Sequence, residues 1–338
     1  MGISAGAATS ARGGATGTGR PGRAADGPAV EVVQLRKTYG DLVAVDDVSF
    51  SVAEGEIFGI LGPNGAGKTT TVECITGLRQ PDAGRVRVLG LDPQADGAEL
   101  HEVVGVQLQS SELQGLLRVR EILDLYQSFY RNPASADEVM EVLGLAAKRD
   151  ARYKTLSGGQ KQRLSIALAL IGQPQVAVLD EMTTGLDPTA RRGVWDFIEK
   201  VRDRGTTMIL VTHFMDEAQR LCDRVMLIDH GRIAATGTPG QLAEQAGGGK
   251  RVTFVPDKPF DDDLLTGLPE ISRVERHGSH VVVYGSGQLV NAVLKTLTVA
   301  GVTANDVELE SATLEDAFVH LTGSHPREPD TTAEVPRP

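Results

Sequence analysis

The sequence predicts an α/β fold built around a parallel sheet. Continuous apolar runs at 176–179, 208–211 and 225–228 are typical of parallel strands covered on both faces. Segments in which apolar residues recur at helical spacing alternate with such runs. A glycine-rich stretch at 62–69 joins a predicted strand to a predicted helix. Alternating strands and helices of this kind indicate an α/β core.

The composition is that of a globular chain with room for two domains. Of its 338 residues, 41% are hydrophobic and 23% are charged. The net charge of −11 argues against a general nucleic-acid binder, because such proteins usually carry a basic surplus. The two cysteines, Cys74 and Cys222, lie far apart within apolar patterns, which favours buried free thiols over a disulfide. No apolar run approaches the roughly 20 residues of a membrane span.

The first folded elements follow a segment of low hydrophobicity. Residues 1–28 consist mainly of Gly, Ala, Ser, Thr and Arg and lack the apolar block of a signal peptide. Such a segment buries too little apolar area to offset its ordering entropy, so we expect disordered tails there and at 324–338. The predicted elements after it are a helix from Thr70 and strands at 30–35, 43–52, 56–61 and 85–90.

The remaining pattern predicts a large unit at 29–245 and a small one at 250–323. From about 93 to 154 apolar residues recur at threes and fours, which indicates a helical subdomain inserted at about 93–170. The run at 225–228 reads as the last strand of the large unit, and 245–249 reads as a linker. The small unit has predicted strands at 252–255, 280–284 and 302–309 and helices at 289–297 and 313–321. It contains no catalytic motif, so we interpret it as a packing or dimerisation module.

The glycine-rich stretch matches the phosphate-loop pattern G-x-x-x-x-G-K-[ST]. Its glycines allow the backbone to approach a polyphosphate closely, and the helix N-terminus behind them favours anions. Lys68 would reach the β- and γ-phosphates, while Thr69 would ligate Mg²⁺. The alternative is a glycine turn that binds nothing. The residues expected at the nucleotide are Gly62, Pro63, Asn64, Gly65, Ala66, Gly67, Lys68, Thr69 and Thr70.

Two further motifs contain candidate residues for metal binding, catalysis and a second phosphate site. Asp180 and Glu181 directly follow a buried apolar run, at the strand end where parallel sheets bind ligands. Asp180 would hold the metal ion and Glu181 would polarise the attacking water. Ser157 is predicted to cap a helix, and the exposed N–H groups after it form a second phosphate site. The residues of this second motif are Ser157, Gly158, Gly159 and Gln160. One nucleotide does not need two such sites from one chain, so this motif is expected to complete the ATP pocket of another copy.

Taken in order, these motifs resemble the nucleotide-binding subunit of an ABC transporter over about 30–242. The resemblance implies a P-loop NTPase core with an inserted helical subdomain, followed by a small C-terminal α+β accessory domain. It assigns adenine stacking to Tyr39 and contact with Mg²⁺ and the membrane partner to Gln109. It also assigns the dimer contact to Asp187 and the γ-phosphate contact to His213. Catalysis is then expected from Glu181, His213, Gln109 and Lys68, and metal binding from Thr69, Gln109 and Asp180.

The stretch 314–318 with 321–323 resembles the C-terminal extension of drug-resistance exporters of the daunorubicin type. That resemblance implies an ATPase that powers efflux of a drug-like or other small hydrophobic compound. The implied partners are a separate polytopic membrane subunit and a second copy in a head-to-tail ATP-sandwich dimer, at the cytoplasmic face of the membrane. Import instead of export remains an alternative. The rival from another class is a soluble ABC ATPase acting on nucleic acid or the ribosome, which one cassette without sustained heptads disfavours.

Overall fold

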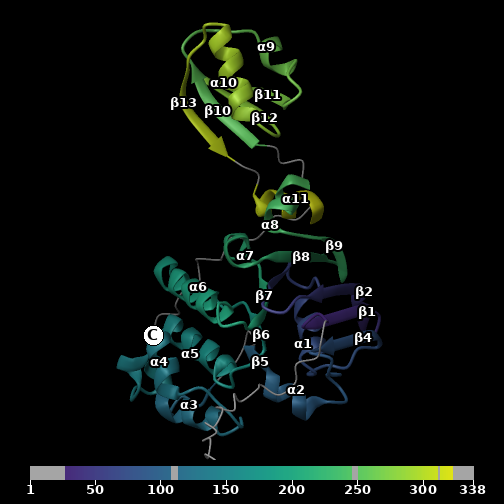
Figure 1. Ribbon diagram of the computed structural model, residues 1–338, viewed down its shortest axis with the longest axis vertical. Helices are drawn as coiled ribbons and strands as arrows, with labels where there is room; N and C mark the ends of the chain where they lie inside the picture. The colour runs from purple at the N-terminus through teal and green to yellow at the C-terminus, as the bar shows by residue number, and fades with distance from the viewer. Residues whose placement is uncertain (1–26, 108–112, 246–249, 311–312, 323–338) are drawn as a thin grey trace, which may run out of the picture.

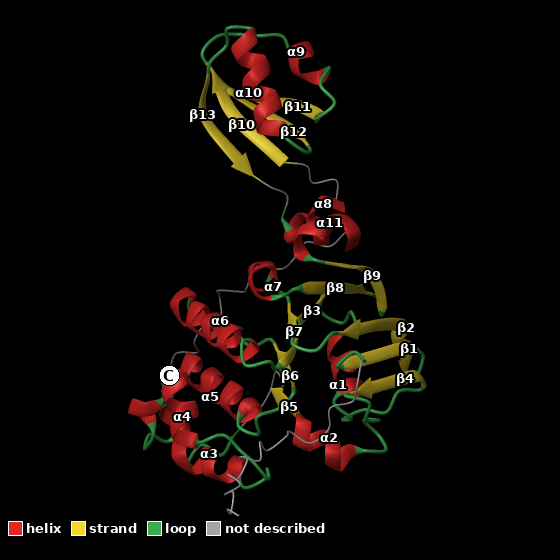
Figure 2. Ribbon diagram, viewed as in Figure 1, coloured by secondary structure: helices red, strands yellow, loops and turns green. Residues whose placement is uncertain are grey.

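The computed structural model describes residues 27–107, 113–245, 250–310 and 313–322. Figure 1 shows a large α/β part and, apart from it, a small module. Figure 2 shows strands at the centre of the large part, with helices on both sides. The expected α/β class is confirmed. The predicted tails, 1–28 and 324–338, lie outside the described residues except for 27 and 28, as does most of the predicted linker.

A six-stranded sheet forms the centre of the large part, in the order β5-β6-β7-β3-β8-β9. All its neighbouring strands are parallel except β8 and β9, which are antiparallel. Its strands are β3 (Ile57–Leu61), β5 (Val104–Gln107), β6 (Val176–Asp180), β7 (Thr207–Thr212), β8 (Arg224–Asp229) and β9 (Arg232–Gly237). Every residue of β3, β6 and β7 is buried, which is why these strands read as continuous apolar runs.

An antiparallel sheet of three strands packs beside the first helix, in the order β2-β1-β4. Its strands are β1 (Val30–Tyr39), β2 (Leu42–Val52) and β4 (Ala83–Val88), and the helix is α1 (Lys68–Ile75). A cluster of buried side chains joins this sheet to α1 and to one face of the central sheet, with Phe50 stacked on Phe58 at 5.2 Å between ring centroids. Cys74 and Cys222 are buried free thiols, as predicted.

The helices of the large part lie mainly on the other face of the central sheet. They are α3 (Val119–Gln127), α4 (Ala136–Val142), α5 (Gly158–Leu170), α6 (Pro188–Arg202), α7 (Met215–Leu221) and α8 (Pro239–Gln245), with 3-10 turns Ala146–Lys148 and Tyr153–Thr155. The helix α2 (Gly97–Val103) instead packs on the side of α1, where its Leu100 is buried in the same cluster as α1. Within the described ranges, no helix is long and apolar enough to cross a membrane.

Two expectations about the central sheet were wrong. The stretch expected to be helical contains β5, which pairs in parallel with β6. Its run of four residues is too short to show a period, and Gly105 lets it approach α5 so closely that a Cβ there would lie 1.9 Å from the Ala169 carbonyl oxygen. The run at 225–228 is not the last strand either, because β9 adds an antiparallel edge strand whose residues are only partly buried.

The small module is a four-stranded antiparallel sheet in the order β11-β12-β10-β13, with its own buried core. Its elements are β10 (Lys250–Pro256), α9 (Asp263–Thr266), β11 (Ile271–His277), β12 (His280–Gly285), α10 (Leu289–Val299) and β13 (Ala304–Glu310). The strand β11 was not predicted, because it lies at an edge and charged residues interrupt its apolar ones.

The final helix, α11 (Leu314–Thr322), does not pack with the small module to which its sequence position assigned it. It contacts α7, α8 and β9 instead. Leu314, Ala317 and Phe318 are buried in the same cluster as Leu242 of α8. The chain therefore leaves the large part after α8, forms the module, and returns to it with α11, because the apolar face of α11 is buried there.

Replacing Phe318 by alanine is expected to lower the free energy of unfolding of the large part by about 3–5 kcal/mol, the usual cost of a buried Phe→Ala change. Phe318 is 2% exposed. Urea denaturation followed by the fluorescence of Trp195, the single tryptophan, which is buried in the same cluster, measures the change. Phe129→Ala is the matched control, because Phe129 is 63% exposed. An equal loss in both variants would contradict the packing of α11.

Candidate functional site

The phosphate loop connects the carboxyl end of β3 to the first residue of α1. Gly65 and Gly67 have φ angles of +81° and +103°, in the left-handed region that glycine adopts without strain. A Cβ on Gly67 would lie 2.4 Å from the Ala44 carbonyl oxygen, so only glycine fits. The loop thus takes a shape that depends on its glycines and leads into a helix N-terminus, as phosphate binding requires.

Lys68 is the first residue of α1, and its ammonium group turns back into the loop. The side chain is 6% exposed, and Nζ donates hydrogen bonds to the carbonyl oxygens of Gly62 and Pro63 at 2.8 and 3.0 Å. Burial lowers the pKa of Lys68, while the nearby Glu181 and Asp180 raise it. A buried cation next to two acids is suited to a polyanion, whose charge replaces lost hydration.

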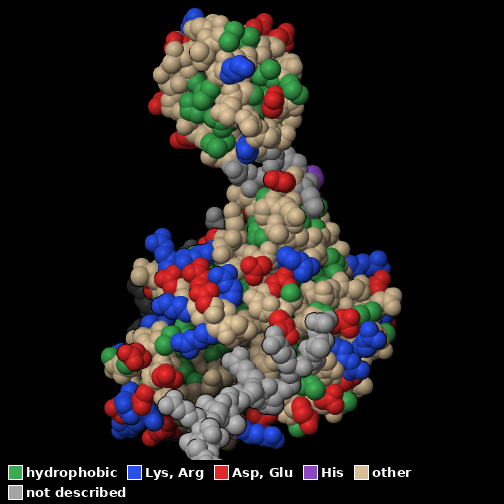
Figure 3. Space-filling view, viewed as in Figure 1, with side chains coloured by type: hydrophobic (Ala, Val, Ile, Leu, Met, Phe, Trp, Pro, Cys, Tyr) green, Lys and Arg blue, Asp and Glu red, His purple; other side chains and the backbone are tan. Residues whose placement is uncertain are grey.

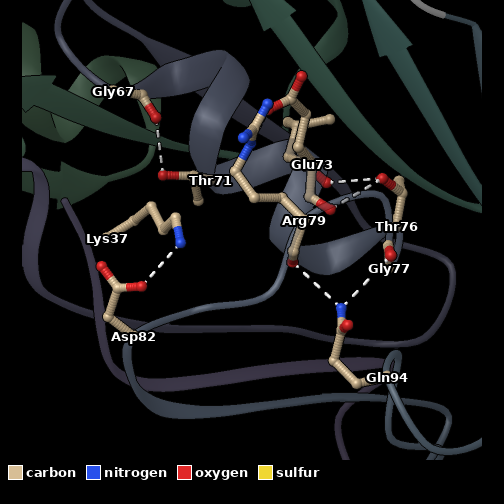
Figure 4. A network of polar contacts seen from close by, with 10 residues as sticks. Lys37, Gly67, Thr71, Glu73, Thr76, Gly77, Arg79, Asp82 and Gln94 are labelled. Carbon is tan, nitrogen blue, oxygen red and sulfur yellow. Dashed lines mark hydrogen bonds and ion pairs between the residues drawn. The ribbon is translucent and has the colours of Figure 1, made fainter. Parts of the chain in front are cut away.

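The contacts in Figure 4 fix the position of α1 and its loop. Thr71 Oγ1 donates to the Gly67 carbonyl oxygen at 2.9 Å, and Arg79 forms an ion pair with Glu73 at 2.5 Å. The Gln94 amide donates to the carbonyl oxygens of Gly77 and Arg79 at 3.3 and 3.1 Å, which ties the end of α1 to the segment before α2. The helix that presents the loop is therefore held at both ends.

Tyr39 ends β1 beside this network. Its ring is 40% exposed, and the guanidinium of Arg79 lies 5.1 Å from its centroid. Lys37 forms an ion pair with Asp82 at 2.7 Å, and hydrogen bonds from Lys37 and Thr38 hold the pKa of Asp82 well below its usual range. Tyr39 is thus an exposed aromatic side chain on a strand that these contacts keep in place.

Asp180 and Glu181 lie at the carboxyl end of β6, the same edge of the sheet to which β3 leads. Asp180 is 2% exposed, and its buried Oδ2 has no hydrogen-bond partner among the described residues. Burial, and then repulsion from Glu181, raises the pKa of Asp180 to about 6, although Lys68 opposes the shift. A buried carboxylate oxygen without a partner is the kind of ligand that a hard divalent cation takes. In the part of the chain that the structure covers, no group of three or more His, Cys, Asp or Glu side chains could hold a metal by itself.

The raised pKa of Asp180 predicts a stability effect in nucleotide-free protein with EDTA. The folded state holds this proton more tightly than the unfolded chain does, so the carboxyl group costs stability as pH rises from about 4 to about 6, and the full cost persists above that window. We therefore expect Asp180→Asn to raise the free energy of unfolding by roughly 2–3 kcal/mol at pH 7.5, from 1.36 kcal/mol per pKa unit. Denaturation at pH 7.5 and pH 4 tests it, because the gain should vanish at pH 4. An equal gain at both values would contradict the assignment.

His213 follows β7 and lies against Glu181, with 3.3 Å between His213 Nδ1 and Glu181 Oε1. Glu181 itself has a φ of +49°, and its N–H group donates to the Val211 carbonyl oxygen at 2.8 Å. The rings of His213 and Phe214 lie 4.1 Å apart, and the Arg191 guanidinium lies 4.3 Å from the Phe214 ring. The fold thus brings together an acid and a histidine that are 32 positions apart in the chain.

Ser157 caps α5, as predicted. Its Oγ accepts the Gln160 N–H at 3.3 Å, and Gln160 Oε1 accepts the Ser157 N–H at 3.1 Å. A Cβ on Gly159 would lie 3.4 Å from Leu186, so this motif packs beside the segment that ends at Asp187. Asp187 caps α6 by accepting the N–H groups of Thr189 and Ala190.

The two specific motifs remain separate within one chain. Among the residues the structure describes, no hydrogen bond or ion pair joins 157–160 to 62–69. Gln109 lies outside the described residues, so the structure gives no position for it.

Known proteins resemble this chain over most of its length. Residues 45–184 match the family described as ABC transporter. The chain is 39% identical over 301 residues to Nod factor export ATP-binding protein I of Rhizobium etli, across 87% of this chain and 93% of that protein. It is 36% identical over 308 residues to daunorubicin resistance ATP-binding protein DrrA3 of Streptomyces coeruleorubidus, across 88% of this chain and 97% of that protein.

Solved structures match the large part of the chain. An ATP-binding subunit of an ABC transporter superposes with a TM-score of 0.60 at 27% identity, over 65% of this chain and 93% of that one. A dimeric, post-hydrolysis ATP-binding cassette bound to ADP and Pi superposes with a TM-score of 0.57 at 28% identity, over 62% of this chain and 98% of that one. Fold, motifs and relatives agree, and the chain therefore belongs to the ABC transporter family.

Proposed function

We propose that this chain is the ATP-hydrolysing subunit of an ABC-2-type exporter that drives efflux of a drug-like or other small hydrophobic compound. The observation that carries the proposal is the convergence of Lys68, Asp180, Glu181 and His213 at one edge of the central sheet. Buried groups of both charges converge there, next to a phosphate loop, which is the arrangement that phosphoryl transfer needs.

We assign each side chain a role that its position supports. Lys68 and the loop N–H groups hold the β- and γ-phosphates, and Tyr39 stacks on the adenine. Glu181 orients the attacking water and accepts its proton. His213 holds the carboxylate of Glu181 and contacts the γ-phosphate. Little of the barrier is covalent, so catalysis is mainly positioning and electrostatic stabilisation.

The donor set also fits Mg²⁺. Thr69 and Asp180 would hold the ion, together with Gln109. Mg²⁺ is commonly bound by one or two carboxylates, water and substrate phosphates, so it needs no complete protein cage. When bound, the ion would neutralise negative charge that develops on the phosphate groups during transfer. The buried, unpartnered Oδ2 of Asp180 is the observation that supports this assignment.

Two copies would complete each site. The N-terminus of α5, a helix of 13 residues, is exposed at Ser157 and Gly158. Its N–H groups at Gly158 and Gly159 suit the γ-phosphate of an ATP held by the other copy, while the Gln160 N–H bonds to Ser157 Oγ. Asp187 would lie at the contact between copies. A related cassette forms a dimer in its solved structure, which supports this arrangement.

The pore would belong to a separate polytopic membrane subunit, with this chain at the cytoplasmic face of the membrane. Closure of the dimer would move that subunit through the helical subdomain, and Gln109 would lie on the route. The names of the two relatives, which speak of export and drug resistance, support export over import. Nothing in the comparisons supports a soluble ATPase acting on nucleic acid. On the face in Figure 3, acidic and basic side chains are interspersed over the large part, without an extended basic stripe.

Affinity purification of tagged Glu181→Gln protein from detergent-solubilised membranes, with ATP and Mg²⁺, tests this function. The variant is chosen because it is expected to hold the closed, ATP-bound state. We expect a polytopic membrane protein to co-purify in near-equal amount. Lys68→Ala protein is the control, because loss of phosphate binding should weaken the ATP-dependent part of the association. Recovery with ribosomes or nucleic acid, and no membrane protein, would overturn the exporter proposal.

A further inference from the structure

Glu217 is a buried acid for which the proposed chemistry has no use. It lies on α7 and is 1% exposed. Its Oε1 accepts a hydrogen bond from Thr183 Oγ1 at 2.8 Å and another from Trp195 Nε1 at 3.0 Å. Burying a carboxyl group to this degree costs free energy of folding, so we expect Glu217 to have a function.

The two donors come from different segments around the site. Thr183 is 0% exposed and lies two residues after Glu181, in the turn that leads to Asp187. Trp195 belongs to α6, which Asp187 caps. Glu217 itself lies four residues after His213. One carboxylate oxygen therefore joins the turn of Glu181, the helix α6 and the helix that follows His213.

This junction has a bearing on Glu181, whose backbone is strained. Its φ of +49° is in the left-handed region, which is unfavourable for a residue with a side chain. Such a conformation persists only when its surroundings hold it. The Glu181 N–H donates to the carbonyl oxygen of Val211 in β7. Two residues further on, Thr183 Oγ1 donates to Glu217. Both acceptors belong to the β7–α7 segment, which also carries His213.

We propose that Glu217 is a positioning residue that fixes the turn of Glu181 against the segment of His213, and that ATP hydrolysis depends on it. The inference rests on the roles proposed above for Glu181 and His213. Because Glu217 acts through Thr183, its loss should misplace the carboxylate of Glu181 while leaving the phosphate loop intact.

An amide should replace this acid in part. Burial raises the pKa of Glu217, and Asp216 adds to the shift, although the side chains of Thr212, Trp195 and Thr183 act against it. The carbonyl oxygen of glutamine can accept the same two hydrogen bonds as Oε1, whereas leucine can accept none. The Gln and Leu variants therefore separate hydrogen-bond acceptance from the filling of space.

The test is steady-state ATP hydrolysis, with kcat and KM for ATP measured separately. We expect Glu217→Leu to lower kcat about 10²-fold, the cost of misplacing a reacting group by roughly 1 Å. KM for ATP should change by less than about threefold, because the phosphate loop still binds ATP through the same contacts. Glu217→Gln should recover most of the lost kcat.

Single changes of the donors show which hydrogen bond matters. Thr183→Val removes the bond to the turn of Glu181 and should lower kcat in the same direction as Glu217→Leu. Trp195→Phe removes the bond to α6 and should lower kcat less, because α6 does not hold Glu181. Equal effects of Thr183→Val and Trp195→Phe on kcat would indicate general packing and overturn the inference. If Glu217→Leu fails to fold, the comparison of Thr183→Val with Trp195→Phe still tests the inference.

Glu56→Leu is the matched control. Glu56 is also a buried acid, 8% exposed, but it lies at the amino end of β3, where it accepts the Ala53 N–H at 2.7 Å. We expect it to lower the thermal midpoint while kcat stays within about twofold of wild type. A wild-type kcat in Glu217→Leu, beside an inactive Glu181→Gln, would overturn this inference alone. An active Glu181→Gln would overturn the proposed function instead.

Discussion

Glu181→Gln is expected to lower ATP hydrolysis about 10²–10⁴-fold, the usual contribution of a general base, while ATP still binds. Glutamine keeps the size of the side chain and can still accept a hydrogen bond. It loses the negative charge that polarises the attacking water and accepts its proton. The 3.3 Å contact between His213 Nδ1 and Glu181 Oε1 places this carboxylate where His213 can orient it.

Two measurements separate chemistry from binding in that variant. Single-turnover hydrolysis reports the chemical step, and equilibrium titration with a fluorescent ATP analogue reports binding. Glu141→Gln is the control, because Glu141 is an exposed acid on α4. Near-normal turnover in Glu181→Gln would remove Glu181 from the proposed mechanism. Loss of ATP binding would mean that the side chain supports the pocket rather than the reaction.

Ser157→Arg is expected to abolish closure of the dimer and, with it, nearly all turnover, while ATP binding to each copy stays intact. The exposed N-terminus of α5 would carry a long cationic side chain where the γ-phosphate of the partner's nucleotide should dock. The lost cap costs only about 0.5–2 kcal/mol of local stability, which is too little to unfold the chain. The effect should therefore be on assembly.

Light scattering in the Glu181→Gln background follows the assembly directly, because that background should accumulate the closed dimer on addition of ATP. The Ser157→Arg double variant should remain monomeric. Ser135→Arg is the matched control, since Ser135 stands at the N-cap of α4 without a side-chain cap hydrogen bond. Ser157→Ala removes the cap without adding bulk and should dimerise in part. A dimer that still forms with Ser157→Arg would contradict the in-trans role.

The sequence predicted those features best whose function allows only a few residue types at each position. The glycines of the phosphate loop, the acids after a buried strand and the capped helix at Ser157 each depend on a few neighbouring residues. The residue identities are enough to predict these motifs, because the local backbone conformation and the burial of the strand decide which residues can stand there. The strands β5, β9 and β11 were missed for the opposite reason. Each is short or lies at an edge, and tertiary pairing rather than periodicity makes it a strand.

The sequence by itself therefore determined the α/β class, the phosphate loop, the Asp180–Glu181 pair and the capping of α5, because all of these depend on residues close together in the chain. Only the tertiary structure decided that α11 returns to the large part, that His213 meets Glu181, and that Glu217 joins Thr183 to Trp195. Those contacts link residues 22 to more than 70 positions apart, and their partners follow from how helices pack on the sheet. Burial of apolar surface and satisfaction of buried polar groups select that packing, and both are properties of the whole fold.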